Sequence, residues 1–136
     1  MLKKLVIFSI ISVNLGYTAL LFPLLGTLYP SKVPLTVHNL LAFLLTDTAW
    51  GIILALVIYT VTRITKVSLV RASTYSVVTM WIIFWVISTL LTGDPNATST
   101  DNIIIIGTDG IAALVTWSAL SGLIKHYLTS VNTSGT

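Results

Sequence analysis

Charge is scarce in this chain of 136 residues: only 8% of the residues are charged, whereas 55% are hydrophobic. Soluble domains carry about 25% charged residues. Cysteine is absent, which excludes disulfides, thiolate nucleophiles and iron–sulfur clusters. Glutamate is absent as well, so the four acidic residues are all aspartates. Because long stretches carry almost no charge, the sequence indicates a protein that lies in a lipid bilayer.

Four apolar stretches are each long enough to cross a hydrocarbon core of about 30 Å, which takes about 20 helical residues. They cover residues 5–28, 37–62, 72–91 and 103–127. We predict an all-α fold, an integral membrane four-helix bundle that forms a single domain over residues 1–136. Pro23 lies near the end of the first stretch and is expected to bend its last turn. The remaining residues are too few for a soluble catalytic domain.

The basic residues predict how the spans are oriented. With four spans, six of the seven basic residues fall on one side: Lys3, Lys4, Arg63, Lys66, Arg71 and Lys125. Cytoplasmic loops carry the excess of Lys and Arg, so we expect both termini in the cytoplasm and the protein in the plasma membrane. The apolar run after Lys4 continues without a clear cleavage site, which predicts an uncleaved first span rather than a signal peptide.

Two polar segments lie outside the predicted spans. Residues 92–102 form an extracytoplasmic loop rich in turn-forming residues, and residues 129–136 form a flexible cytoplasmic tail. The loop contains Asn96, followed by alanine and threonine, a match to the N-glycosylation acceptor pattern. Asn96 is therefore a candidate glycosylation site, although Ser/Thr-rich loops also produce this pattern by chance.

Small residues recur at helical spacing within the spans. The residues expected to let helices approach closely are Gly16, Gly51, Ala55, Ser118 and Gly122. Lipid provides no hydrophobic drive between spans, so contacts between helices depend on such close packing. These residues predict helix packing and no chemistry.

Asp47 and Asp109 are unusual because each lies inside a predicted span. Each precedes a basic residue, Arg63 or Lys125, by sixteen positions. At 1.5 Å per residue, both carboxylates lie about 24 Å from the cytoplasmic basic layer and therefore share one depth. The spacing of Asp47 to Gly51 places its side chain toward a helix contact rather than toward lipid.

Other polar residues fall near the same depth. They are Thr46 and Thr108, which precede the two aspartates, together with Thr18 and Ser88. Trp50 and Trp85 also fall near this level. Such a layer predicts a site for a proton, a cation or a polar ligand. The alternative is that the two aspartates are structural and cap or join helices. Asn14 is expected to form hydrogen bonds across helices.

The separation of 62 residues between Asp47 and Asp109 suggests a weak repeat of two plus two helices. Only three residue pairs are identical over the 31 positions that such a repeat would align, namely Thr46/Thr108, Asp47/Asp109 and Ser68/Ser130. The repeat is an hypothesis about topology and carries no function.

The sequence offers no site for a metal or cofactor. His38 and His126 lie at opposite ends of their spans, too far apart to bind one haem or metal ion. No nucleophile and base fall at a common depth, so we do not expect an enzyme. The basic residues flank the spans instead of alternating with aromatics, which excludes nucleic acid as a partner.

Two functions fit this pattern. The first is a small non-catalytic membrane subunit that packs into a larger respiratory or transport complex and stabilises it. The alternative is a small oligomeric transporter or channel that uses Asp47 and Asp109 to couple to protons or cations. Expected partners are the lipid bilayer and either other membrane subunits or further copies of the chain.

Overall fold

The regular structure of the chain is entirely helical in the part that the computed structural model describes, which is residues 2–31, 33–92 and 100–134. The side chains of residues 84, 85, 87–92, 100–106 and 131–134 lie outside that description. The elements are α1 (Leu2–Val13), η1 (Asn14–Leu21), α2 (Phe22–Leu28), α3 (Val37–Thr65), α4 (Leu69–Thr92) and α5 (Thr100–Ser134). The prediction of an all-α fold is confirmed.

Three helices are long and apolar enough to cross a membrane. They are Leu2–Leu28, which joins α1, η1 and α2, then Val37–Thr65, and Gly107–Ser130 within α5. The fourth predicted span lies in α4, of which Leu69–Ile83 forms a shorter apolar helix within the described part. The structure therefore supports a membrane protein with at least three helices of spanning length.

The first helix changes its pitch just before Pro23. Residues Asn14–Leu21 form a π-helix, and the N–H of Phe22 donates to the carbonyl of Tyr17, five residues earlier. Pro23 has no N–H, and its ring would clash with the carbonyl four residues before it in an α-helix. A wider turn removes that conflict, so the helix continues through Pro23 to Leu28. The bend expected from the sequence takes the form of this π-helical segment.

The connection between α3 and α4 is shorter than residues 63–71, the segment that the predicted spans leave between them. Only Lys66, Val67 and Ser68 lie between the two helices. Lys66 ends α3 in the left-handed conformation, with φ 58° and ψ 22°, and its N–H donates to Thr62 O at 3.0 Å. Ser68 Oγ accepts from the N–H of Arg71 at 3.3 Å and thereby caps the start of α4. A tight helical hairpin results.

Replacing Lys66 by glycine is expected to stabilise this hairpin. A left-handed conformation costs a residue with a Cβ atom about 1–2 kcal/mol, and glycine avoids that cost. Glycine also has more conformational entropy in the unfolded chain, which offsets part of this gain. We therefore expect the free energy of unfolding of Lys66→Gly to rise by only about 0.5–1 kcal/mol. Thermal unfolding in detergent, followed by circular dichroism, measures the change. Lys66→Ala removes the same charge but keeps a Cβ atom, so an equal gain in that variant would contradict the backbone explanation.

Helix α5 extends beyond the predicted span at both ends. It begins at Thr100, within the predicted loop, and continues to Ser134, through most of the predicted tail. No proline or glycine occurs between Gly122 and Gly135, so no residue in this stretch forces the helix to end. The rest of the loop, with the glycosylation candidate Asn96, lies outside the described residues.

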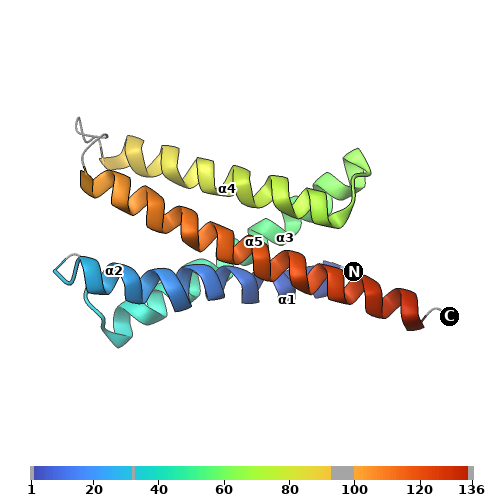
Figure 1. Ribbon diagram of the computed structural model, residues 1–136, viewed down its shortest axis with the longest axis horizontal. Helices are drawn as coiled ribbons and strands as arrows, with labels where there is room; N and C mark the ends of the chain where they lie inside the picture. Colours follow the sequence, from blue (N-terminus) through green and yellow to red (C-terminus); the bar gives the residue numbers. More distant parts are fainter. Residues whose placement is uncertain (1, 32, 93–99, 135–136) are drawn as a thin grey trace.

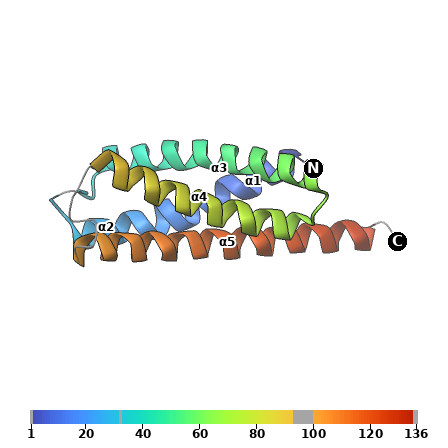
Figure 2. The ribbon, with the colours of Figure 1, turned by 90° about the horizontal axis from the view of Figure 1, so that it is seen from above.

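The helices run roughly along the long axis of the molecule, and α1 begins at the same end at which α5 finishes (Figures 1 and 2). The first helix packs against α3 on one side and α5 on the other, and α4 packs against both α3 and α5. The residues that meet between these helices are fully or nearly buried: Leu5, Val13 and Tyr17 from the first helix, Leu54 and Ile58 from α3, Ala72 and Val77 from α4, and Ala112, Leu120 and Ile124 from α5.

Candidate functional site

Asp47 lies in the contact between α3 and η1, where its side chain is only 7% exposed. Its Oδ2 atom lies 2.5 Å from Thr18 Oγ1 of η1. A carboxyl group in an apolar helix contact is costly unless polar groups bind it. Thr18 provides such a group from the neighbouring helix.

Asp47 belongs to a longer hydrogen-bond network that runs through Thr18 to Asn14 and from Asn14 to Thr48. Thr18 Oγ1 lies 3.0 Å from Asn14 Oδ1, and Asn14 Nδ2 donates to Thr48 Oγ1 at 3.4 Å. The same Nδ2 donates to Ile10 O at 2.9 Å, which fixes the orientation of the Asn14 amide. Thr48 Oγ1 donates to Leu44 O at 2.7 Å. We call Asn14, Thr18, Asp47 and Thr48 the polar network.

The spacing of these residues explains why they meet. Asn14 and Thr18 are four residues apart and lie on one face of η1, while Asp47 and Thr48 are neighbours on α3. One turn farther along α3, Gly51 lets the two helices approach closely. A Cβ atom built at Gly51 would lie 2.7 Å from Ile10 Cα and 2.9 Å from Ile10 N. The glycine therefore brings α1 and α3 near enough for the side chains of the network to bind each other.

Tyr17 belongs to η1, which packs against both helices that carry the two aspartates of the candidate site. It lies on η1 between α3 and α5, is 6% exposed, and is within electrostatic reach of both Asp109 and Asp47. Asp109 is half-buried on α5, and the preceding Thr108 is buried. Tyr17 lies inside the first predicted span, where hydropathy gives no reason to separate a tyrosine from its apolar neighbours.

The other residues assigned to the polar layer behave differently from Asp47. Thr46 is exposed on the outer face of α3, whereas Asp47 is buried. Successive helical residues differ by about 100° in direction, which turns Thr46 away when Asp47 faces η1. Trp50 is half-buried in a groove described below. The side chains of Ser88 and Trp85 lie outside the described residues.

The small residues chosen for helix packing divide into two groups. Gly16, Gly51 and Ala55 are buried between helices, and a Cβ atom at Gly16 would collide with Thr116 Oγ1 and the carbonyl of Ala112 on α5. Ser118 and Gly122 are exposed, and nothing lies within 4 Å of a Cβ atom at Gly122. Within the described part of this chain, they therefore lie outside the contacts between helices.

The reason is the register of α5. The face that packs against the first helix carries Ala112, Thr116 and Leu120, spaced by four. Ser118 lies two positions from Thr116, about 200° around the helix, and therefore points away from this contact. Both faces of α5 carry small residues, so their spacing alone did not identify the buried face.

The histidines take no part in the polar network. His38 and His126 are both exposed, near opposite ends of their helices. Among the described residues, no group of three histidine, cysteine or acidic side chains could hold a metal ion. The chemistry available around Asp47 is therefore that of hydroxyl, amide and carboxyl groups.

Comparison of the chain with models of protein families, with curated proteins and with solved structures found no match in any of the three.

Proposed function

We propose that this chain is an integral membrane four-helix bundle of the plasma membrane that takes up and releases a proton at Asp47, as a small proton-coupled transporter or channel. The excess of basic residues on one side supports an orientation with both termini in the cytoplasm. The polar network supports the site. The observation that carries the proposal is that Thr18 has fewer hydroxyl hydrogens than it has neighbouring acceptor oxygen atoms.

Thr18 has one hydroxyl hydrogen but faces two acceptors, Asp47 Oδ2 and Asn14 Oδ1. If Asp47 were ionised, this hydrogen would satisfy only one of the two oxygen atoms. If Asp47 carries a proton, it donates to Thr18 Oγ1, and the Thr18 hydroxyl donates to Asn14 Oδ1. The Asn14 amide and the Thr48 hydroxyl then continue the network to backbone carbonyls. A protonated Asp47 therefore gives every member of the network a donor or an acceptor.

Proton release at Asp47 would reverse the hydrogen bond to Thr18 and leave Asn14 Oδ1 without that donor. The protonated and ionised states thus favour different arrangements of η1 and α3. A π-helical segment is often found at functional sites, and here it carries both Asn14 and Thr18. Tyr17 interacts electrostatically with both Asp47 and Asp109, and Asp109 would provide a second carboxyl group for the same proton pathway. Oligomerisation would enclose the pathway, because four short spans enclose little space on their own.

Infrared spectroscopy of the protein in vesicles at neutral pH tests the protonation state directly. We expect a carbonyl stretch from a protonated carboxylic acid that disappears in Asp47→Asn. The Thr18→Val variant should shift the band, because it removes the hydroxyl group that lies within hydrogen-bond distance of Asp47 Oδ2. The Asp109→Asn variant serves as the matched control and should retain the Asp47 band. Identical carboxylic-acid spectra for the wild type and Asp47→Asn would overturn the proposal.

The second candidate is a non-catalytic subunit of a larger respiratory or transport complex. It is supported by the small share of the described residues outside helices, namely residues 29–31, 33–36 and 66–68. These segments leave the described part of the chain without an extramembrane domain. Purification in mild detergent should then yield partner subunits in fixed stoichiometry. A well-behaved preparation containing only this chain would count against the subunit role and leave the proton site untouched.

A further inference from the structure

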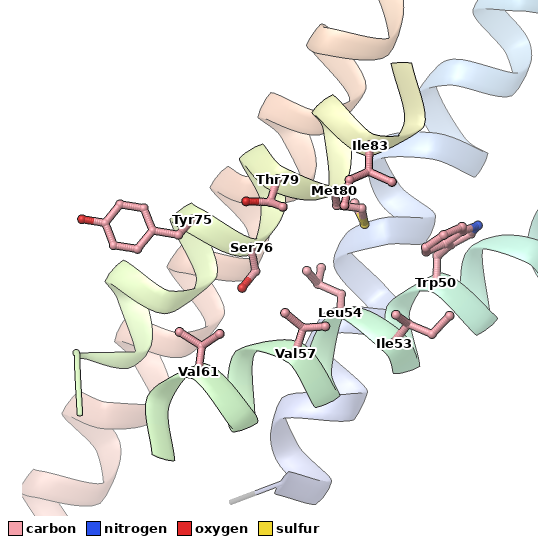
Figure 3. A pocket seen from close by; sticks show the side chains of 10 residues that line it. All are labelled: Trp50, Ile53, Leu54, Val57, Val61, Tyr75, Ser76, Thr79, Met80 and Ile83. Atoms are coloured by element: carbon pink, nitrogen blue, oxygen red, sulfur yellow. The ribbon is translucent and has the colours of Figure 1, made fainter. Parts of the chain in front are cut away.

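A groove between α3 and α4 is lined mostly by apolar side chains and lies apart from the polar network. It encloses about 250 Å³, and its walls are side chains of the two helices that face each other (Figure 3). Val61 and Tyr75 line the end beside the α3–α4 connection, and Trp50 and Ile83 line the other end. Trp50 and Val61 are eleven positions apart, which corresponds to about 16 Å along α3, close to half of a hydrocarbon core about 30 Å thick. The groove therefore spans one leaflet.

A second, more open depression lies on the other side of a ridge on α3. The ridge consists of Ile53, Val57 and Val61, spaced by four, and these three residues line both hollows. The second hollow encloses about 300 Å³ and also includes Leu56 and Thr60. Two parallel apolar channels separated by a single row of side chains match the two hydrocarbon chains of one lipid better than they match one helix of a partner.

The end of both channels is strongly basic. Arg63, Lys66 and Arg71 are exposed beside the α3–α4 connection. The sequence has no acidic residue between Asp47 and Asp94, so neither α3 beyond Asp47 nor the described part of α4 carries a carboxylate beside this cluster. Arg63 also lies over the ring of Tyr59, with its guanidinium carbon 5.4 Å from the ring centroid. The cluster lies at the depth of the headgroups when the channels hold hydrocarbon chains.

We propose that this face of α3 and α4 binds a two-chain phospholipid with an anionic headgroup from the cytoplasmic leaflet. The two hydrocarbon chains lie on either side of the ridge, and the phosphate contacts Lys66 and Arg71. Each basic residue near an anionic headgroup strengthens the affinity for the anionic lipid about fivefold. The site depends on the proposed orientation of the chain and is independent of proton binding at Asp47.

Native mass spectrometry tests this site. The protein is reconstituted in vesicles of phosphatidylglycerol and phosphatidylcholine with identical chains in equal amounts, then extracted in mild detergent, and the retained lipids are counted by mass. We expect phosphatidylglycerol to be retained in preference to phosphatidylcholine. The double variant Lys66→Gln/Arg71→Gln should lower this preference at least fivefold. Lys3→Gln/Lys4→Gln removes the same charge from two residues that line neither hollow and should leave the preference unchanged.

Filling the groove provides a second, independent variant. Val57→Trp places a large side chain on the ridge between the two channels and should reduce retention of both lipids, with helical content unchanged by circular dichroism. The proposal is overturned if the two lipids are retained equally, or if both double variants lose the preference to the same extent. Retention of a second copy of the chain in place of lipid, lost in Val57→Trp, would also overturn it and identify a protein interface instead.

Discussion

We expect Gly16→Ala to destabilise the protein by about 3 kcal/mol, the upper end of the cost of adding a methyl group to a tightly packed contact. A Cβ atom at Gly16 would collide with the carbonyl of Ala112 and with Thr116 Oγ1. Because a backbone carbonyl cannot rotate away as a side chain can, η1 and α5 must separate. The midpoint of thermal unfolding in detergent, measured by circular dichroism, should fall accordingly.

Gly122→Ala is the matched control for this prediction. Both variants add one methyl group to a glycine of a long helix, but nothing lies within 4 Å of a Cβ atom at Gly122. Alanine is favoured over glycine in a helix by about 1 kcal/mol, so Gly122→Ala should leave the stability unchanged or raise it. Equal losses in both variants would show that the cost does not arise from the contact between η1 and α5. A loss confined to Gly122→Ala would place the important helix contact on the opposite face of α5.

The helices themselves could be predicted because hydropathy and length determine them. The apolar stretches place the first helix and α3 nearly as the structure does. The π-helical form of Asn14–Leu21 could not be predicted, because α- and π-helical turns have the same hydropathy pattern. Pro23 was the only indication, and a proline is equally compatible with a bend. Small polar residues predict a tail after residue 128, but none of them interrupts a helix, and α5 extends to Ser134.

The level of Asp47 along α3 follows from the sequence, but the direction in which its side chain points does not. Counting residues from Arg63 gives the level of Asp47 along α3, and the nearby Gly51 indicates the face. Such counting cannot show that Asp47 is buried while Thr46 is exposed, because this depends on where the neighbouring helix lies. Tyr17 was missed for a related reason, since only the packing of η1 between α3 and α5 brings its ring within reach of both carboxyl groups.

The polar network and the close helix contact depend on each other. Gly51 allows α1 to approach α3, and this approach brings Asn14 within reach of Thr48. The same short helix spacing buries Asp47, and Thr18 of the neighbouring helix forms a hydrogen bond with it. A variant that separates α1 from α3 would therefore lose the network together with the packing. Variants that test proton transfer should consequently change Asp47 or its partners and leave Gly51 in place.

Substitution of the intramembrane carboxyl groups is expected to abolish proton transport. In Asp47→Asn the amide can still form a hydrogen bond with Thr18, so the fold should survive, but the amide cannot release a proton at neutral pH. Proton flux into vesicles that contain a pH-sensitive dye, driven by a potassium diffusion potential, should fall at least tenfold. Asp109→Asn should have the same effect, because the proposed pathway requires both carboxyl groups.

Thr46→Val is the matched control for the flux measurement. Thr46 adjoins Asp47 in the sequence but is exposed on the outer face of α3, so removing its hydroxyl should leave the flux unchanged. Loss of flux in Asp47→Asn with normal flux in Asp109→Asn would restrict the pathway to the polar network. Unchanged flux in both carboxyl variants would remove the two aspartates from any transport mechanism. The polar network would then act as a structural link between η1 and α3, and the role of a non-catalytic subunit would be favoured.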